Sequence, residues 1–308
     1  VRVLLLFYSG EFRAFYVSTT NTKILTANSV VMVLTNVVLN YILIFGKFGF
    51  PALGIAGAAI ASSISEAVSV LFFVIYTWKK IDYKKYGLFR FTRVDFRMLG
   101  QILSVSIWVM IQHGIAFGGW FIFFIAMEHL GERPLAITNV VRSISSFLFM
   151  FVNAFASTNS SLVSNLIGAG ESDRVLPLCR RMIGLCYAFV LPIGILIAMF
   201  PSTVLRIYTD NPDLIASSIS SLWVMLSSYL FAVPGFIYFF SVSGTGNTRR
   251  ALEIDMASIF VYVLYILYVA VWLRADVAVC WTTEYVYNIM ILSSFFYLWK
   301  GNWRNKKI

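Results

Sequence analysis

Charged side chains are scarce in this sequence. Only 12% of the 308 residues are charged and 59% are hydrophobic, whereas about a quarter of the residues in a soluble domain are charged. Blocks of 18 or more mostly apolar residues recur along the chain, which is typical of membrane-spanning helices. A soluble protein with buried core helices would need polar helix faces, and these blocks lack them. The composition therefore predicts an all-α integral membrane protein.

Cysteine is rare as well. Cys179, Cys186 and Cys280 have no CxxC spacing and lie in or beside apolar segments, which argues against a disulfide framework or a zinc site. The catalytic motifs HExxH, GxSxG and GxxxxGK[ST] are absent, and SGTGNTR at 243–249 lacks the Lys-Ser/Thr end of a phosphate-binding loop. We therefore expect neither an enzyme nor a cofactor.

Acidic residues are fewer than basic ones, 14 against 24, and the net charge is +10. In a soluble protein this excess would suggest a nucleic-acid partner. Here the basic residues cluster in the connectors between apolar blocks, where they orient the chain and meet anionic lipid headgroups. We expect membrane lipid as a partner and no nucleic acid.

Eight membrane spans are predicted after a short apolar stretch, 1–17, that resembles the end of a helix. That stretch is too short for a span and is followed by no cleavage site of a signal peptide. The spans are 25–46, 53–78, 98–127, 134–166, 173–200, 213–243, 251–273 and 277–299.

Lysine and arginine are unevenly shared between alternate connectors. One set of connectors, which includes the C-terminal tail, holds 17 of these residues, and the other set holds four. Such asymmetry predicts that the richer set and the C-terminus face the cytoplasm. The longest connector, 79–97, carries seven basic residues. It predicts a cytoplasmic linker between two bundles, 1–78 and 98–308.

A polar connector occurs twice. VSTTNTK at 17–23 and SGTGNTR at 243–249 share two threonines and an asparagine and end in a basic residue. The two spans after each copy match in order and orientation, as in transporters built from repeats. In the second half 149 residues, 98 to 246, precede the Asn-Thr pair, but only 20 precede it in the first. We expect roughly 125 to 130 further residues before this chain, giving about twelve helices in two pseudo-symmetric bundles, the first of them incomplete here.

Carboxylates inside spans are the leading site candidates, because a buried charge in hydrocarbon is costly and is usually functional. Glu66 lies near the middle of the second span, and the repeat places Glu284 opposite it. Glu66 could bind a coupling cation, take a proton or neutralise a cationic substrate, or it could be a protonated acid bonded to a neighbouring helix. Asp255 and Glu253 lie close to Arg249 and Arg250, so we expect local charge pairs there.

Other candidates are polar or helix-breaking residues inside spans. Gln112 and His113 lie mid-membrane, and an imidazole titrates near physiological pH; a hydrogen bond from His113 to a carbonyl is the alternative. Pro192 and Pro234 each remove a helical hydrogen bond, so they are hinge candidates or static kinks. Asn36 and Asn40 are four residues apart and share one helix face.

Four strings resemble the multidrug and toxic compound extrusion (MATE) family. They are NVVLNYILIFGKFGFPALGIAGAAIA (36–61), FIFFIAMEHLGERPLAI (121–137), LVSNLIGAG (162–170) and SGTGNTR (243–249). The resemblance covers essentially the whole chain, from late in helix 4 through helix 12. It implies two six-helix bundles, a central cleft, and extrusion of organic cations or drugs driven by Na⁺ or H⁺.

The resemblance also bears on the site residues. In one branch of the family the pair at Asn36 and Asn40 is Asn and Asp, which form a cation site with a hydroxyl that matches Ser62. Another branch has acids where this sequence has Ala116 and Pro234, so we do not expect that branch's carboxylate site. Asn40 in place of an acid can still ligate Na⁺ through its carbonyl oxygen, but helix packing explains these amides equally well.

Three functions follow as hypotheses. The first is a cation-coupled multidrug antiporter, expected to be a monomer in the bacterial inner membrane. The second is a flippase for lipid-linked oligosaccharides of the same superfamily, which would need several basic residues in its cleft; the spans contain essentially only Arg142. The third is an inactive membrane fragment or scaffold.

Overall fold

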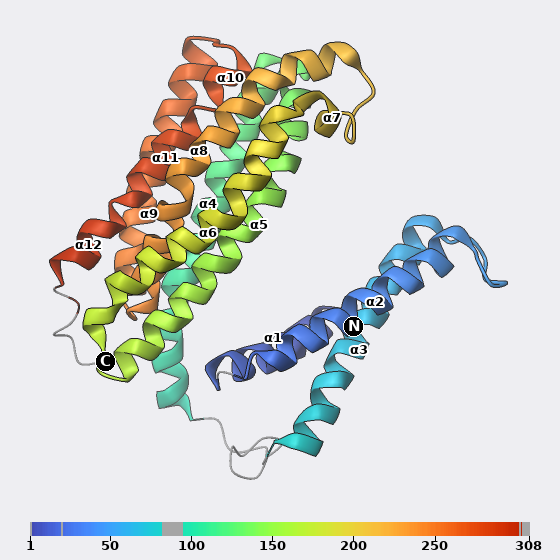
Figure 1. Ribbon diagram of the computed structural model, residues 1–308, viewed down its shortest axis with the longest axis vertical. Coiled ribbons are helices and arrows are strands. Elements are labelled where there is room, and N and C mark those ends of the chain that lie inside the picture. Colours follow the sequence, from blue (N-terminus) through green and yellow to red (C-terminus); the bar gives the residue numbers. More distant parts are fainter. Residues whose placement is uncertain (1, 20, 82–94, 302, 304–308) are drawn as a thin grey trace. The chain divides into compact units, whose positions relative to one another are not determined.

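In the computed structural model all regular secondary structure is helical over the residues that it describes, 2–19, 21–81, 95–301 and 303. The chain divides into two compact units, Val1–Val94 and Asp95–Ile308 (Figure 1). The boundary falls within the predicted linker 79–97, most of which lies outside the described residues. Each unit is described by itself.

The N-terminal unit contains three helices, α1 (Arg2–Ser18), α2 (Lys23–Phe45) and α3 (Gly54–Lys80). Helices α2 and α3 pack side by side, and Gly57 lets them approach so closely that a Cβ there would lie 2.5 Å from the Leu43 carbonyl oxygen. Helix α1 packs on α3 through Tyr16, which stacks on Phe73 and shares a 2.6 Å hydrogen bond with Thr77. The stretch expected to be the end of a helix is therefore helical.

The C-terminal unit is built around α8 (Pro212–Gly244), which has the most buried residues of the described helices and packs against at least seven of them. Around it lie α4 (Phe96–Leu130), α5 (Glu132–Gly168), α6 (Val175–Met199), α9 (Thr248–Ile266), α11 (Thr283–Leu292) and α12 (Ser294–Lys300). The shorter elements are η1 (Ser172–Arg174), α7 (Pro201–Leu205), the π-helical η2 (Leu267–Trp272) and α10 (Val277–Cys280).

Helix boundaries follow local chemistry. Helix α4 begins after Asp95, whose carboxylate accepts hydrogen bonds from the backbone N–H groups of Arg97 and Met98. Helix α8 begins after Asn211 in the same way, with Pro212 at its first position, where a missing N–H costs nothing. Seven helical stretches of the described chain are long and apolar enough to cross a membrane, and they correspond to the first seven predicted spans.

The eighth predicted span, 277–299, is helical but not continuous. It divides into α10, α11 and α12, with breaks at Trp281–Thr282 and at Ser293. The hydroxyl groups of Thr282 and Thr283 donate to the carbonyls of Val279 and Cys280. Such side-chain bonds compete with the helical backbone ladder, and they coincide with the first break.

The repeated polar connectors occupy equivalent places. The first lies between α1 and α2, and the second between α8 and α9. Their capping differs, since the Asn247 side chain accepts from the Arg250 backbone N–H whereas α2 begins without a side-chain cap. Asn247 also donates to the Tyr297 hydroxyl at 2.8 Å, which ties the second connector to α12.

Candidate functional site

A polar seam joins α2 and α3 in the N-terminal unit. The amide of Asn36 donates to Ser65 at 3.1 Å and to Ser62 at 3.4 Å, and the amide of Asn40 donates to the Asn36 carbonyl oxygen at 2.9 Å. The structure thus brings together three of the predicted cation-coupling residues. Further along the same helices, Asn28 donates to Ser69 at 2.8 Å.

One side-chain oxygen of this seam is available as a hydrogen-bond acceptor or a cation ligand. The side-chain oxygen of Asn40 is buried and accepts no hydrogen bond from the described residues. Glu66 lies one helical turn beyond Ser62 on α3 and is half-buried, so these side chains share a face. Amide, hydroxyl and carboxylate oxygens are ligands that a hard cation such as Na⁺ accepts. The bonds among Asn36, Ser62 and Ser65 also fit an ordinary packing role, so both interpretations of the seam stay open.

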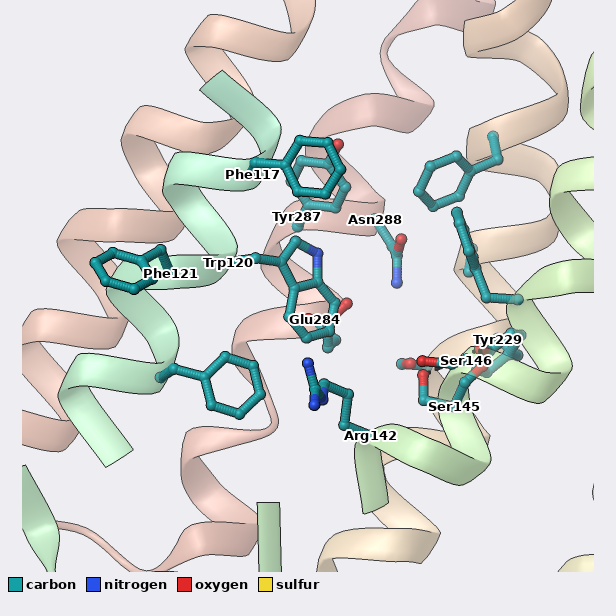
Figure 2. Close-up of a pocket in the computed structure, with 15 residues that line it drawn as sticks. Phe117, Trp120, Phe121, Arg142, Ser145, Ser146, Tyr229, Glu284, Tyr287 and Asn288 are labelled. Atoms are coloured by element: carbon teal, nitrogen blue, oxygen red, sulfur yellow. Dashed lines mark hydrogen bonds between the residues drawn. The ribbon is translucent and has the colours of Figure 1, made fainter. Parts of the chain in front are cut away.

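Two neighbouring cavities lie inside the C-terminal unit. We call the first the Arg142 cavity; it measures about 430 Å³, which is the size of a pocket for a small organic molecule. Helices α4, α5, α8 and α11 supply its walls (Figure 2). Its lining comprises Phe117, Trp120, Phe121, Phe124, Arg142, Ser145, Ser146, Phe149, Ser228, Tyr229, Ala232, Phe236, Glu284, Tyr287 and Asn288.

We call the second the Asp255 cavity, and it measures about 350 Å³. Its polar lining includes Gln112, His113, Asn153, Asp255 and Glu284, and most of the rest is aromatic. The two cavities share a wall that contains Trp120, Glu284 and Tyr287. They are therefore adjacent chambers in one helical bundle.

All three second-bundle candidates line these cavities. Gln112 and His113 reach the Asp255 cavity from α4, and Glu284 faces both cavities from α11. Ala116 also lines the Asp255 cavity, at the position where the second branch has an acid. The carboxylates that line these chambers come instead from α9 and α11.

Asp255 was interpreted wrongly from sequence. We expected it to pair with Arg249 or Arg250, but it is only 1% exposed and accepts a 2.9 Å hydrogen bond from the Tyr287 hydroxyl. Its neighbour Glu253 forms both expected ion pairs, at 3.5 Å with Arg249 and at shorter range with Arg250. Asp255 therefore belongs to the cavity, and its bond to Tyr287 joins α9 to α11.

The spacing of these residues along the helix could have indicated that Glu253, and not Asp255, pairs with the two arginines. Glu253 follows Arg249 and Arg250 by four and three residues and therefore shares their face. Asp255 follows them by six and five residues, which turns it to another side of the helix. Its partner Tyr287 is 32 residues away in sequence, and no local pattern indicates that contact.

Both hinge candidates lie inside long helices, Pro192 in α6 and Pro234 in α8. Proline has no N–H, so Pro234 leaves the carbonyl of Leu230 without its helical donor. The hydroxyl of Tyr187, on α6, donates to that carbonyl at 2.6 Å. Next to Pro234, Gly235 lets α11 approach closely, because a Cβ there would lie 3.1 Å from the Asn288 carbonyl oxygen.

Comparison with known proteins identifies the family. The model of the MatE family matches residues 109–271, more than half of the chain, and this match contains α5, α6 and α8 and most of α4. The chain belongs to the MATE transporter family. It is therefore an integral membrane protein of a family of transporters rather than enzymes, as the sequence predicted.

Curated relatives agree with this assignment. The chain is 28% identical over 239 residues to the probable multidrug resistance protein NorM of Thermotoga maritima, covering 77% of this chain and 50% of that protein. It is 24% identical over 228 residues to the uncharacterized transporter YisQ of Bacillus subtilis, covering 71% and 47%. The chain spans about half the length of the curated relatives it matches.

Solved structures of MATE transporters share the fold. An outward-facing multidrug resistance MATE transporter of the MOP superfamily superposes with a TM-score of 0.78 at 18% identity, covering 89% of this chain and 61% of that one. A point mutant of the Vibrio cholerae MATE transporter VcmN superposes with a TM-score of 0.80 at 18% identity, covering 99% and 68%. The MATE fold, with its helices in this order, is therefore shown for the chain.

Proposed function

We propose that this chain serves secondary active efflux of aromatic organic cations, coupled to Na⁺ or H⁺ through alternating access. The observation that carries the proposal is the pair of cavities in the C-terminal unit, which combine aromatic walls with the carboxylates of Asp255 and Glu284. The names of the relatives, which include multidrug resistance proteins, agree with a small organic substrate.

The chemistry of the cavities suits a cationic aromatic molecule. Phe117, Trp120 and Phe121 line the Arg142 cavity, and aromatic rings of this kind attract both flat apolar molecules and cations. When ionised, Glu284 supplies a negative charge among mostly apolar side chains, where the attraction to a cation is stronger than in bulk water. A substrate that is both aromatic and cationic gains from both terms.

Coupling requires that an ion and the substrate favour different conformations of the transporter. Asp255 bonds to Tyr287 of α11, and Glu284 lies one turn before Tyr287 on the same helix. An ion or proton that binds Glu284 changes the charge in both cavities, and one that binds Asp255 changes the charge in the Asp255 cavity and the bond between α9 and α11. We therefore assign coupling to Asp255 and Glu284, with Asn36, Asn40, Ser62 and Glu66 as a second candidate site.

The setting of this function is the cytoplasmic membrane of a bacterium, since the named relatives are bacterial. The distribution of lysine and arginine supports a cytoplasmic C-terminus. We propose that the transporter acts as a monomer in contact with membrane lipid.

Efflux measured with each ion gradient applied separately tests the proposal. Cells that express the protein are loaded with a fluorescent aromatic cation, and efflux is started by a Na⁺ gradient at constant pH or by a pH gradient without Na⁺. We expect one gradient to drive efflux and both Glu284→Gln and Asp255→Asn to reduce it by at least tenfold.

The matched control is Glu253→Gln, which removes an exposed acid two residues from Asp255 and should leave efflux unchanged. Glu66→Gln examines the N-terminal candidate in the same assay. Undiminished efflux by both the Asp255 and the Glu284 variants would overturn the assignment to the C-terminal cavities.

A further inference from the structure

The side chain of Arg142 is a basic group inside a membrane-spanning helix. It is the eleventh residue of α5, so it lies about 15 Å along the helix from Glu132. A guanidinium inside a membrane-spanning helix is costly and usually marks a functional site. Sequence analysis gave it no role in transport, yet it lines a cavity.

Arg142 is held at the cavity by an aromatic ring rather than by an acid. Its guanidinium carbon lies 4.6 Å from the centre of the Phe124 ring. In the described part of the chain, no carboxylate lies within 4.0 Å of its nitrogens, although Glu284 lines the same cavity. The guanidinium therefore has donors available for a ligand, in the planar arrangement that matches a carboxylate.

A second polar group points to a ligand at the same place. Asn288 is only 2% exposed, and neither the nitrogen nor the oxygen of its side-chain amide hydrogen-bonds to another described residue. Figure 2 shows its amide directed into the cavity that Arg142 enters from the opposite helix. Ser146 also lines this space, whereas the Ser145 hydroxyl is within hydrogen-bond distance of Tyr229 at 3.1 Å. The amide nitrogen can donate hydrogen bonds to a bound anion.

The Arg142 cavity therefore has two chemical poles. Arg142 and Asn288 can donate hydrogen bonds to an anion, and Glu284 can attract a cation. Trp120 and Phe117 supply aromatic surface to the same cavity. A purely cationic ligand would satisfy Glu284 but would face the positive charge of Arg142.

We propose that Arg142 is a specificity-determining residue that makes this cavity favour aromatic molecules carrying a carboxylate. The proposal rests on the efflux function above and defines the substrate class of the same site. The carboxylate binds the Arg142 guanidinium and the Asn288 amide, and a basic nitrogen of the same molecule, where present, faces Glu284. The volume of about 430 Å³ fits a drug-sized molecule.

Rhodamine B and its ethyl ester provide a matched pair of probes. Both carry the same aromatic cation, and they differ in whether the carboxylate is free or esterified. The 308-residue chain is placed in lipid nanodiscs, and the binding of each dye is measured by fluorescence anisotropy. We expect the wild-type chain to bind the free acid about tenfold more tightly than the ester, as one charge-assisted bidentate contact permits.

The Arg142→Gln variant should abolish this preference. It should weaken the binding of rhodamine B about tenfold and change the binding of the ester by less than about twofold. Arg142→Lys should keep part of the preference, because it retains the charge but not the planar fork. Arg133→Gln is the control, since Arg133 bonds Ser217 and does not line the cavity.

The outcomes separate this proposal from the efflux function. Glu284→Gln should weaken both dyes alike if the cavity binds their shared cation. If the wild-type chain prefers neither dye, or if Arg142→Gln weakens both equally, the role of Arg142 in specificity is wrong while the cavity can still be the cation site. If neither dye binds to the wild-type chain, the cavity is not the substrate site and both proposals are overturned.

Discussion

The hydroxyl of Tyr187 on α6 lies 2.6 Å from the carbonyl oxygen of Leu230 on α8 and donates a hydrogen bond to it. That carbonyl is the one that Pro234 deprives of its helical donor. The bond therefore satisfies a backbone group freed inside α8 and joins two membrane-spanning helices next to the Arg142 cavity, which Tyr229 lines.

A double-mutant cycle measures this relationship. Tyr187→Phe alone should lower the free energy of unfolding by about 1 kcal/mol, because the Leu230 carbonyl loses its donor. In a Pro234→Ala background the new backbone N–H can serve that carbonyl, so the same change should cost less. The free energies come from titration with a denaturing detergent.

The control for this cycle is Tyr285→Phe. The Tyr285 hydroxyl also bonds to α8, but to the Ser227 side chain rather than to a freed carbonyl. Its effect should be the same with and without Pro234. If Tyr187→Phe also lowers the free energy of unfolding by the same amount with and without Pro234, the proline and the tyrosine act independently.

Glycine contacts give a prediction about stability within the same bundle. A Cβ on Gly244 would lie 2.5 Å from the Ser160 carbonyl oxygen, whereas a Cβ on Gly184 would meet no atom within 4 Å. Gly244→Ala should destabilise the bundle by about 1–3 kcal/mol. Gly184→Ala should be neutral or stabilise it by at most about 1 kcal/mol. Similar melting temperatures for the two variants would contradict the close approach of α5 and α8.

The fold was predictable because membrane spans have long, repetitive patterns. Apolar stretches such as 213–243 agree within a residue with helix Pro212–Gly244. The last span was less predictable, because whether Thr282 and Thr283 bond to the backbone depends on local geometry. Local chemistry of this kind decides helix continuity, and composition does not.

The site was predictable only in part. Glu284, Gln112 and His113 stood out because each is polar in an apolar span, and all three line the cavities. Arg142 had the same signal, but its sequence position was used only to weigh the flippase hypothesis, and its place in the cavity became evident from the packing of α5. The partnership of Asp255 with Tyr287 depends on how α9 packs against α11, and a single sequence carries no record of such a tertiary contact.

The two interpretations of the α2–α3 seam predict different results. Asn36→Ala removes the bonds to Ser62, Ser65 and Asn40, whereas Asn40→Ala removes only its bond to Asn36. For packing alone, Asn36→Ala should cost about 2 kcal/mol and Asn40→Ala about half as much.

The measurement for the seam is thermal stability in NaCl and in choline chloride at equal ionic strength. For a Na⁺ site, the wild-type chain should melt at a higher temperature in NaCl, and both variants should lose the difference. In either salt we expect Asn36→Ala to lower the stability more than Asn40→Ala does. Equal costs of the two variants would contradict the hydrogen-bond pattern of the seam.

Orientation in the membrane can be tested with introduced cysteines, because the three native cysteines are buried. Asp173 and Asp210 are exposed and lie in successive connectors, which the distribution of basic residues places on opposite sides. We expect a membrane-impermeant maleimide to label Asp210→Cys in intact cells and Asp173→Cys only after lysis. The reverse pattern would place the C-terminus outside.

The most direct test of the central claim is to map where a substrate binds. A photoreactive aromatic cation is cross-linked to the protein in nanodiscs, and the labelled peptides are sequenced by mass spectrometry. If the C-terminal cavities bind the substrate, the labels will fall on α4, α5 or α11 at residues such as Trp120, Ser146 and Tyr287, and an excess of unlabelled substrate will abolish them. The claim would be contradicted if the labels that unlabelled substrate abolishes were confined to residues 1–81, or to exposed positions of α6 such as Phe189 and Ile195.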